Sequence, residues 1–427
     1  MLSFLQIYCE KQVDPSILAI VGSTQVTAYS FYNSYSNILI NSQIQDSEYE
    51  RNKHLNKMIR TKLFSEEARK EKLILGPEEK SMILMEKEKA LREELYNHII
   101  GSEVEPIPDS VSRLHYKWQH TEIHIKHLFH KNKERIDSLK IRLNSDPGLF
   151  NSIARSLFEN YKLKNSGGDL GWISYNTLDP ALEKLAYEIP VGEISDPVQS
   201  SYGWHILLKI NERVQLIISE DEYQIQKPAI IRSVSTKQKK VLADSYVNNL
   251  MTNDISIHDS LVNQTLRDIH WIISQKRENL SELYPIIDGE KIKSVLKDLK
   301  LNQDLILARF PDGNFTIYDL LDALRQSKPV VFSRNPLQSF YIALRDKILT
   351  VEAKKLKLEN NLAVQLKTQD AKDNYLAREY LLSIKGQTET AYISSKELTK
   401  ITKRLQSKIP IKIYDKHLKK LFDYSLR

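Results

Sequence analysis

Histidines are concentrated in one stretch of the chain, and their spacing decides which of them could do chemistry. Five lie in that stretch, at positions 115, 120, 124, 127 and 130, and a further one, His205, follows later. An imidazole can bind a metal, exchange a proton near neutral pH or hold a hydrogen-bond network. The spacing matches no standard set of metal ligands, and no carboxylate or cysteine pattern accompanies it. We therefore expect neither a metal nor another cofactor.

Two predicted strands carry the histidines that lie among apolar residues. The segment EIHIKHLF (122–129) alternates apolar and polar side chains, which predicts a β-strand. In such a strand His127 shares a face with Ile123, Ile125 and Phe129. The segment WHILLK (204–209) predicts a second strand, in which His205 stands beside apolar residues. His127 and His205 are therefore the candidates for a shared site.

Glycine marks the part of the chain that holds these strands. The chain has 427 residues and only 12 glycines, and six of them fall between residues 119 and 212. Turns at glycines and strands at both ends predict a compact α+β domain there. The rest of the chain is charge-rich with helical periodicity, as in MIRTKLFSEEARKEKL (58–73), and predicts a mainly helical body.

The glycine-rich segment resembles the parvulin-type (PpiC) peptidyl-prolyl cis-trans isomerases. The resemblance rests on GGDLGW (167–172), on LDPALEKLAYEIPVGEISDPVQSSYGWHILLK (178–209) and on KHLF (126–129). It implies an enzyme that isomerises X-Pro peptide bonds without a covalent step. The barrier of ~20 kcal/mol reflects lost amide resonance, and an apolar pocket that desolvates the carbonyl would lower it.

The resemblance also implies roles for single residues. His127 and His205 would meet in the centre of the domain, hydrogen-bonded to each other and to the hydroxyl of Ser200. The substrate would be bound by Leu170, Leu178, Leu182 and Tyr202. Asn160 and Tyr161 occupy the positions where the family often has Asp or Cys. Tyr161 can donate a hydrogen bond but carries no charge at neutral pH. This difference favours the alternative of a weak or inactive isomerase that only binds clients.

The flanking segments resemble the chaperone regions of SurA and PrsA-type foldases. The resemblance rests on MIRTKLFSEEA, directly before the isomerase domain, and on residues 222–251, directly after it. It implies a folding factor of the periplasm or cell envelope that binds unfolded exported proteins with X-Pro segments. A nucleic-acid partner is not expected, because the net charge is only +7 and basic residues alternate with acidic ones.

Three sequence blocks recur along the chain in the same order. LAIVGSTQVTAYSF (18–31) aligns on LARFPDGNFTIYDL (307–320), residues 58–73 align on ALRDKILTVEAKKLKL (343–358), and ISIHD (255–259) aligns on IKIYD (411–415). The repeat predicts a duplicated strand-plus-helices module, with the isomerase domain inserted into the first copy only.

These patterns divide the chain into five segments. They are a tail or truncated signal (1–17), the first chaperone copy (18–118), the isomerase domain (119–212), returning helices that complete the first copy (213–300) and the second copy (301–427). The expected fold class is α+β. We expect a mainly helical chaperone body with an inserted parvulin domain, which has a small antiparallel sheet and surrounding helices.

The N-terminal segment MLSFLQIYC is apolar but too short to span a membrane, and no run of 18 or more apolar residues occurs in the sequence. The single cysteine, Cys9, cannot form an intramolecular disulfide. It follows an apolar stretch and precedes polar residues, which resembles a truncated bacterial lipoprotein signal with Cys9 as the lipidated residue. A plain apolar tail is the alternative, and the sequence leaves the oligomeric state open.

Overall fold

The structure is a computed structural model, and its described residues form two compact units. The described ranges are 16–101, 106–200, 202–215, 219–252, 254–275, 304–324, 332, 334–385 and 393–422. Unit 1 comprises Met1–Leu95 and Asp254–Arg427, and unit 2 comprises Tyr96–Asn253. The predicted isomerase segment lies wholly within unit 2. Cys9, the candidate for lipidation, lies outside the described residues.

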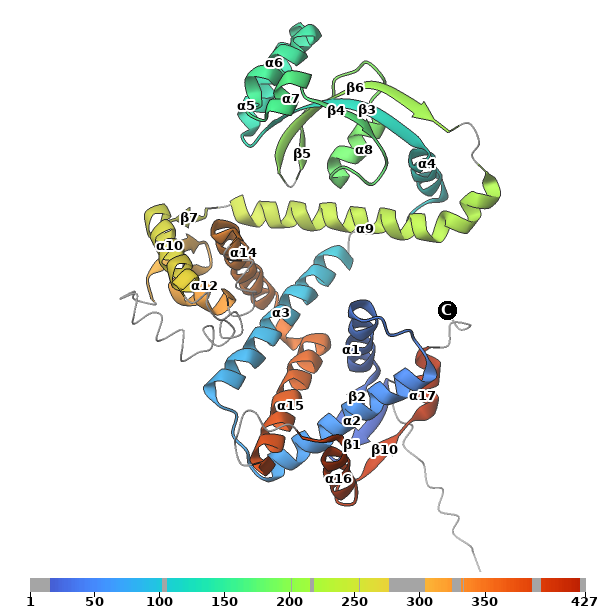
Figure 1. Cartoon of the computed structure of the whole chain (residues 1–427), viewed down its shortest axis with the longest axis vertical. Coiled ribbons are helices and arrows are strands. Elements are labelled where there is room, and N and C mark those ends of the chain that lie inside the picture. Colours follow the sequence, from blue (N-terminus) through green and yellow to red (C-terminus); the bar gives the residue numbers. More distant parts are fainter. Residues whose placement is uncertain are drawn as a thin grey trace, which may run out of the picture. The chain divides into compact units, whose positions relative to one another are not determined.

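A four-stranded antiparallel sheet forms the centre of unit 2, with the strand order β4-β3-β6-β5 (Figure 1). The strands are β3 (Thr121–His130), β4 (Asp169–Ile173), β5 (Val198–Ser200) and β6 (Gly203–Val214). The central strands β3 and β6 pair along their length, from Thr121 opposite Val214 to His130 opposite Trp204. The two strands predicted to carry the histidines are therefore direct neighbours.

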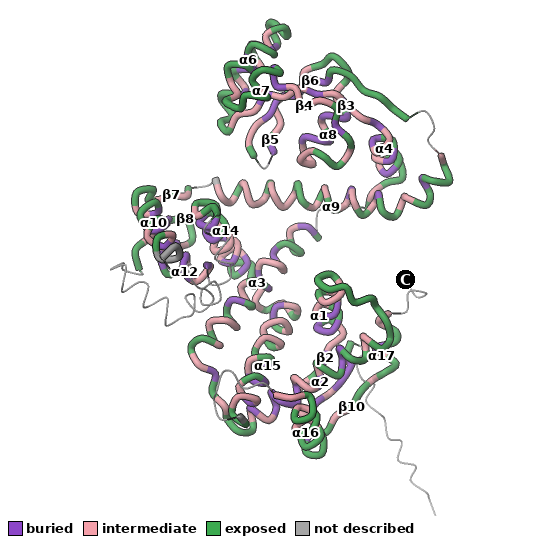
Figure 2. The backbone as a smooth tube through the Cα atoms, in the orientation of Figure 1, coloured by how far each residue is buried: buried purple, intermediate pink, exposed green. Residues whose placement is uncertain are grey.

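Helices cover both faces of this sheet. Leu128 on one face packs on α5 and α6, whereas Ile125 on the other face packs on α4 and α8, and both side chains are fully buried. Figure 2 shows buried stretches along the strands and helices of this unit. The helices of unit 2 are α4 (Asp109–Gln119), α5 (Lys133–Ser145), η1 (Pro147–Leu149), α6 (Phe150–Leu157), α7 (Tyr161–Ser166), α8 (Pro180–Glu188) and α9 (Glu220–Thr252). Apolar residues at alternate positions of β3 thus serve two separate cores.

Unit 1 contains two three-stranded antiparallel sheets, β10-β1-β2 and β7-β8-β9. The strands are β1 (Ile17–Val21), β2 (Thr24–Thr27), β7 (Ser256–Ile257), β8 (Ile306–Phe310), β9 (Gly313–Thr316) and β10 (Ile411–Ile413). The helices are α1 (Ala28–Asn41), α2 (Glu48–Lys70), α3 (Pro77–Gly101, in unit 2 from Tyr96), α10 (Asp259–Gln275), α12 (Ile317–Leu324), α14 (Pro336–Lys355), η3 (Leu358–Asn360), α15 (Leu362–Lys385), α16 (Ser395–Gln406) and α17 (Asp415–Leu421).

The α+β class expected from the sequence is confirmed, because small antiparallel sheets are set in a mainly helical chain. One part of the expected arrangement differs from the structure. We expected 213–300 to complete the first copy, but its strand β7 pairs with β8 of the second copy, and β10 pairs with β1 of the first. Within the described ranges, no helix is both long enough and apolar enough to cross a membrane.

Candidate active site

The pairing of β3 with β6 places His127 and His205 on one face of the sheet. His205 lies opposite Phe129, and His127 lies opposite Leu207. Residues opposite one another, or two apart on the same strand, point to the same side of a sheet. The two imidazole rings are stacked, with their centroids 5.9 Å apart and their planes at 24°.

Ser200, at the end of β5, contacts this pair. Its Oγ lies 2.8 Å from Nε2 of His205, and the backbone N–H of Tyr202 donates to the same Oγ at 3.0 Å. The expected hydrogen bond between the two imidazoles is not formed. In the described part of the chain, the buried His127 Nε2 and His205 Nδ1 have no hydrogen-bond partner. The two rings are therefore nearly parallel without being joined by a hydrogen bond.

Two phenylalanines flank the histidine pair and extend it to a row of four rings. Phe158, just after α6, stacks on His127 with the ring centroids 5.1 Å apart. Phe129 lies against His205 with the centroids 4.9 Å apart. Strand alternation had placed Phe129 on the face of His127. Phe158 was missed, because it follows a helix and belongs to none of the recognised motifs.

Both imidazoles are neutral at neutral pH. Burial lowers the pKa of His127 to about 4, and the neighbouring His205 acts in the same direction. Burial also lowers the pKa of His205 to about 4, against an opposing effect of Asp179. A neutral imidazole has one donor and one acceptor nitrogen. The site therefore presents uncharged hydrogen-bonding atoms among aromatic rings.

We expect these buried histidines to make unit 2 less stable in mild acid. Their pKa values are about 4 in the folded protein, and an unperturbed imidazole has a pKa of about 6.5. The unfolded chain therefore takes up protons first as the pH falls. The contribution of each neutral histidine to the free energy of unfolding is fully present above about pH 6.5. It declines as the pH falls towards 4, by on the order of 2 kcal/mol per histidine.

Urea unfolding at pH 7.5 and pH 5 would check this expectation. Tryptophan fluorescence suits the measurement, because Trp118, Trp172 and Trp204 belong to unit 2. The variant His205→Gln, which does not titrate, should lose less stability between the two pH values than the wild type. An equal loss in both proteins would contradict the assignment.

The leucines expected to bind substrate lie near the face that carries the histidines. Leu170 and Leu178 are half-buried against the core cluster that contains Leu207, the residue opposite His127. Leu182 is buried on α8, which contacts β5, the strand of Ser200. Tyr202 is 74% exposed. Their role in binding substrate stays a prediction.

Tyr161 and Asn160 do not reach the histidine pair through hydrogen bonds. The side chain of Tyr161 is 81% exposed, and its hydroxyl has no hydrogen-bond partner among the described residues. Asn160 is the N-cap of α7, and its side chain accepts hydrogen bonds from the backbone N–H groups of Lys162 and Leu163 at 3.0 and 3.2 Å. This position therefore starts a helix, and it adds no charge beside the imidazoles.

The glycine turn holds the backbone of His127. The backbone N–H of His127 donates to the carbonyl of Gly168 at 2.9 Å. Gly168 has a φ of +81°, and a Cβ atom there would lie 2.3 Å from the carbonyl oxygen of His127. Only glycine tolerates this combination. In the same turn, Asp169 accepts a hydrogen bond from Gly171 N–H at 2.7 Å, as expected of a turn residue.

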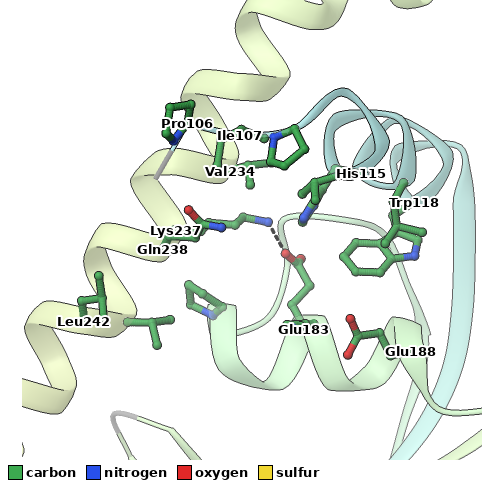
Figure 3. Close-up of a pocket in the computed structure, with 16 residues that line it drawn as sticks. Pro106, Ile107, His115, Trp118, Glu183, Glu188, Val234, Lys237, Gln238 and Leu242 are labelled. Atoms are coloured by element: carbon green, nitrogen blue, oxygen red, sulfur yellow. Dashed lines mark hydrogen bonds and ion pairs between the residues drawn. The ribbon is translucent and has the colours of Figure 1, made fainter. Parts of the chain in front are cut away.

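Unit 2 also contains an open cavity of about 620 Å³ between α4, α8 and α9 (Figure 3). Lys237 of α9 forms an ion pair there with the buried Glu183 of α8. Nδ1 of His115 lies 2.6 Å from the hydroxyl of Tyr175, and burial lowers the pKa of this histidine to about 4. Neither His127 nor His205 lines the cavity. Within the described ranges, no cluster of His, Cys, Asp or Glu could hold a metal ion.

Comparisons with known proteins identify the domain. Residues 123–211 match the family described as "Rotamase: PPIC-type PPIASE domain". The chain is 30% identical over 152 residues to the foldase protein PrsA of Oceanobacillus iheyensis, covering 34% of this chain and 50% of that protein. It is 32% identical over 102 residues to the chaperone SurA of Sodalis glossinidius, covering 22% and 24% of the two chains. A crystal structure of a PpiC-type isomerase domain matches at 28% identity and a TM-score of 0.21, covering 23% of this chain and 95% of that one.

Residues 123–211 therefore form a PpiC-type, or parvulin, peptidyl-prolyl cis-trans isomerase domain, and the resemblance expected from the sequence is confirmed. The chain is similar to PrsA and SurA foldases. The chain spans about half the length of the PrsA relative and about a quarter of the SurA relative.

Proposed function

We propose that this chain is a folding factor of the bacterial cell envelope, whose parvulin domain isomerises X-Pro bonds in unfolded exported proteins. The observation that carries the proposal is the stacked pair of His127 and His205, hydrogen-bonded to Ser200, within a PpiC-type domain. The foldase and chaperone relatives support a role with unfolded clients.

The proposed mechanism needs no covalent bond to the protein. Rotation about the X-Pro bond is slow because the planar amide is stabilised by resonance, with a barrier of ~20 kcal/mol. Leu170, Leu178 and Leu182 bind the prolyl ring and exclude water from the carbonyl, which favours the less polar, twisted amide. The neutral imidazoles of His127 and His205 lie on one face of the sheet and keep this side of the site uncharged.

A second candidate function is client binding with weak or no isomerase activity. The observation that favours it is Tyr161, which is 81% exposed. This residue stands where parvulins often have Asp or Cys. In this case the domain would bind proline-containing segments without accelerating their isomerisation.

A protease-coupled assay with a proline peptide distinguishes the two functions. We expect the full chain to accelerate isomerisation, and Ser200→Ala to lower kcat/KM about fivefold, because the hydrogen bond that orients His205 is worth about 1 kcal/mol. Ser152→Ala is the matched control, because its hydroxyl bonds only the carbonyl of Leu149 on an exposed part of α6. Melting temperatures of both variants separate lost activity from lost folding.

The same proteins are then tested for suppression of aggregation of an unfolded client. Isomerisation at the uncatalysed rate, together with full suppression of aggregation, would establish the second function instead of the first. If Ser200→Ala kept both isomerase activity and suppression of aggregation, this serine would not belong to the proposed site.

A further inference from the structure

Unit 1 contains the same β-hairpin twice. β1 and β2 have the same lengths as β8 and β9, and the register shift between Ile17 and Ala19 recurs between Ile306 and Ala308. After each hairpin a threonine begins the next helix. Thr27 accepts from the backbone N–H of Ser30, and Thr316 accepts from that of Asp319. The repeat seen in the sequence is thus a repeat in backbone geometry.

Each hairpin has a third strand, and the two third strands occupy equivalent positions. β10 pairs with β1 so that Lys412 lies opposite Ile20, and β7 pairs with β8 so that Ser256 lies opposite Arg309. The aligned sequences place Ile20 with Arg309 and Lys412 with Ser256. The hydrogen bonds just beyond the strands also correspond. They are Tyr414 N–H to Leu18 carbonyl and His258 N–H to Leu307 carbonyl, both at 2.9 Å.

Both third strands pair with the hairpin of the other copy. β7 follows the first hairpin along the chain but joins the second, whereas β10 follows the second hairpin but joins the first (Figure 1). The helices follow the same pattern. α15 of the second copy packs on α2 of the first, with Leu376 and Tyr380 in the same buried cluster as Leu63. In return, α3 of the first copy reaches α14 of the second, where Arg92 donates to Thr350 Oγ1 at 3.1 Å.

The segments that pass from one copy to the other begin after equivalent turns. α2 and α14 are aligned in the repeat, and each ends in a residue whose N–H donates to the carbonyl four positions earlier, at Glu67 and Glu352. The next residues, Lys72 and Lys357, have φ values of +57° and +55°. This left-handed conformation is uncommon for residues with a side chain, so its recurrence at aligned positions indicates one inherited turn.

We infer that unit 1 is a domain swap within one chain, in which two copies of a module exchange the helix that follows the turn at Lys72 or Lys357 (α3 or α15) and the third strand (β7 or β10). The edge of β1 that β2 leaves unpaired accepts β10 from the other copy, and the corresponding edge of β8 accepts β7. In the described part of the chain, the first hairpin shares its buried cluster with Leu376 and Ile409 of the second copy, and β8 of the second hairpin contacts α10 of the first copy. The swap therefore makes unit 1 one cooperative body and not two independent modules.

Cysteine crosslinking of the full chain tests this inference, in a Cys9→Ser background. Opposed residues of an antiparallel pair lie at a distance that a disulfide can span. The swap predicts that Ile20→Cys/Lys412→Cys and Ser256→Cys/Arg309→Cys lose both free thiols within a monomer. The matched controls are the unswapped pairs, Ile20→Cys/Ser256→Cys and Arg309→Cys/Lys412→Cys, which should keep their thiols. Lys412, Ser256 and Arg309 are exposed, so substitution there disturbs no core.

Oxidation of the unswapped pairs would overturn the inference. A disulfide of Ile20→Cys/Lys412→Cys between two chains would overturn it as well, because the strand would then come from a second copy.

A second measurement uses single substitutions and needs no disulfide. Ile409→Ala, in the buried cluster of the first hairpin, and Val262→Ala, on α10 beside β8 of the second hairpin, replace buried side chains. Each substitution should shift the whole unfolding transition of unit 1. Two separate transitions, with only one of them shifted, would indicate independent modules.

Discussion

Asp373→Asn is expected to cost unit 1 about 3 kcal/mol or more of its free energy of unfolding. Asp373 of α15 is fully buried, and its Oδ2 lies 2.6 Å from Nζ of the buried Lys62 of α2. Arg69 pairs with the same carboxylate. Burial opposes the charge of Lys62, but Asp370 and Asp373 together hold its pKa above the usual value. Removing the charge of Asp373 leaves the buried cation of Lys62 without full compensation, and its desolvation then opposes folding.

Asp370→Asn is the matched control for this prediction. Asp370 also contacts Nζ of Lys62, at 2.8 Å, but its side chain is 28% exposed. Water compensates a partly exposed charge, so we expect a loss of about 1 kcal/mol. Urea unfolding followed by far-ultraviolet circular dichroism measures both variants. Equal losses would show that burial does not decide the strength of this network.

The doubly apolar variant Lys62→Met/Asp373→Leu should recover part of that loss, because replacing a buried ion pair by apolar side chains removes the cost of desolvation. The network joins α2 of the first copy to α15 of the second. It therefore contributes to the association of the exchanged parts and not only to the stability of one helix.

Gly168→Ala is expected to cost unit 2 about 3 kcal/mol and to impair isomerase activity. The left-handed conformation at φ +81° costs a residue with a side chain about 1–2 kcal/mol. The added Cβ would also lie 2.3 Å from the carbonyl oxygen of His127, so one of the two backbone segments must move. Because His127 N–H donates to Gly168, such a movement displaces the histidine pair.

Gly171→Ala separates conformational strain from the steric clash. Gly171 has a similar φ of +76°, but a Cβ atom there would meet no atom within 4 Å. We expect it to cost only about 1 kcal/mol and to leave the histidines in place. Urea unfolding followed by tryptophan fluorescence gives the stabilities, and the proline-peptide assay gives the activities. If both variants lost the same stability and activity, the close approach to His127 would not matter.

The candidate site was predictable where short sequence patterns carry it. Alternation along β3 placed His127 on one face with Ile123 and Ile125. In the structure, the pairing of β3 with β6 puts His127 opposite Leu207 and Phe129 opposite His205, so that both histidines lie on this face. Ser200 was found by its position in a recognised motif, and it contacts His205. Phe158 was not predictable in this way, because its contact with His127 depends on how α6 packs on the sheet.

The exposure of a side chain and the orientation of a ring could not be predicted from short sequence patterns. Position relative to the glycine turn suggested Tyr161 as a hydrogen-bond donor in the site. Its side chain is 81% exposed beside the N-cap of α7, and its role stays a prediction. The expected bond between the imidazoles is replaced by stacking at 5.9 Å. The orientation of a ring depends on all neighbours that pack against it, and most of these are distant in sequence.

The sequence by itself determined the local features of this protein: the isomerase domain, the strands that carry His127 and His205, and the repeated hairpins. These features follow from periodicity, glycine turns and motifs, which act over a few residues. Only the tertiary structure decided which hairpin receives β7 and which receives β10. The two strands have equivalent sequences and the same register, so local pairing energy does not distinguish the partners. The turns at Lys72 and Lys357 and the packing of α15 on α2 select the exchanged arrangement.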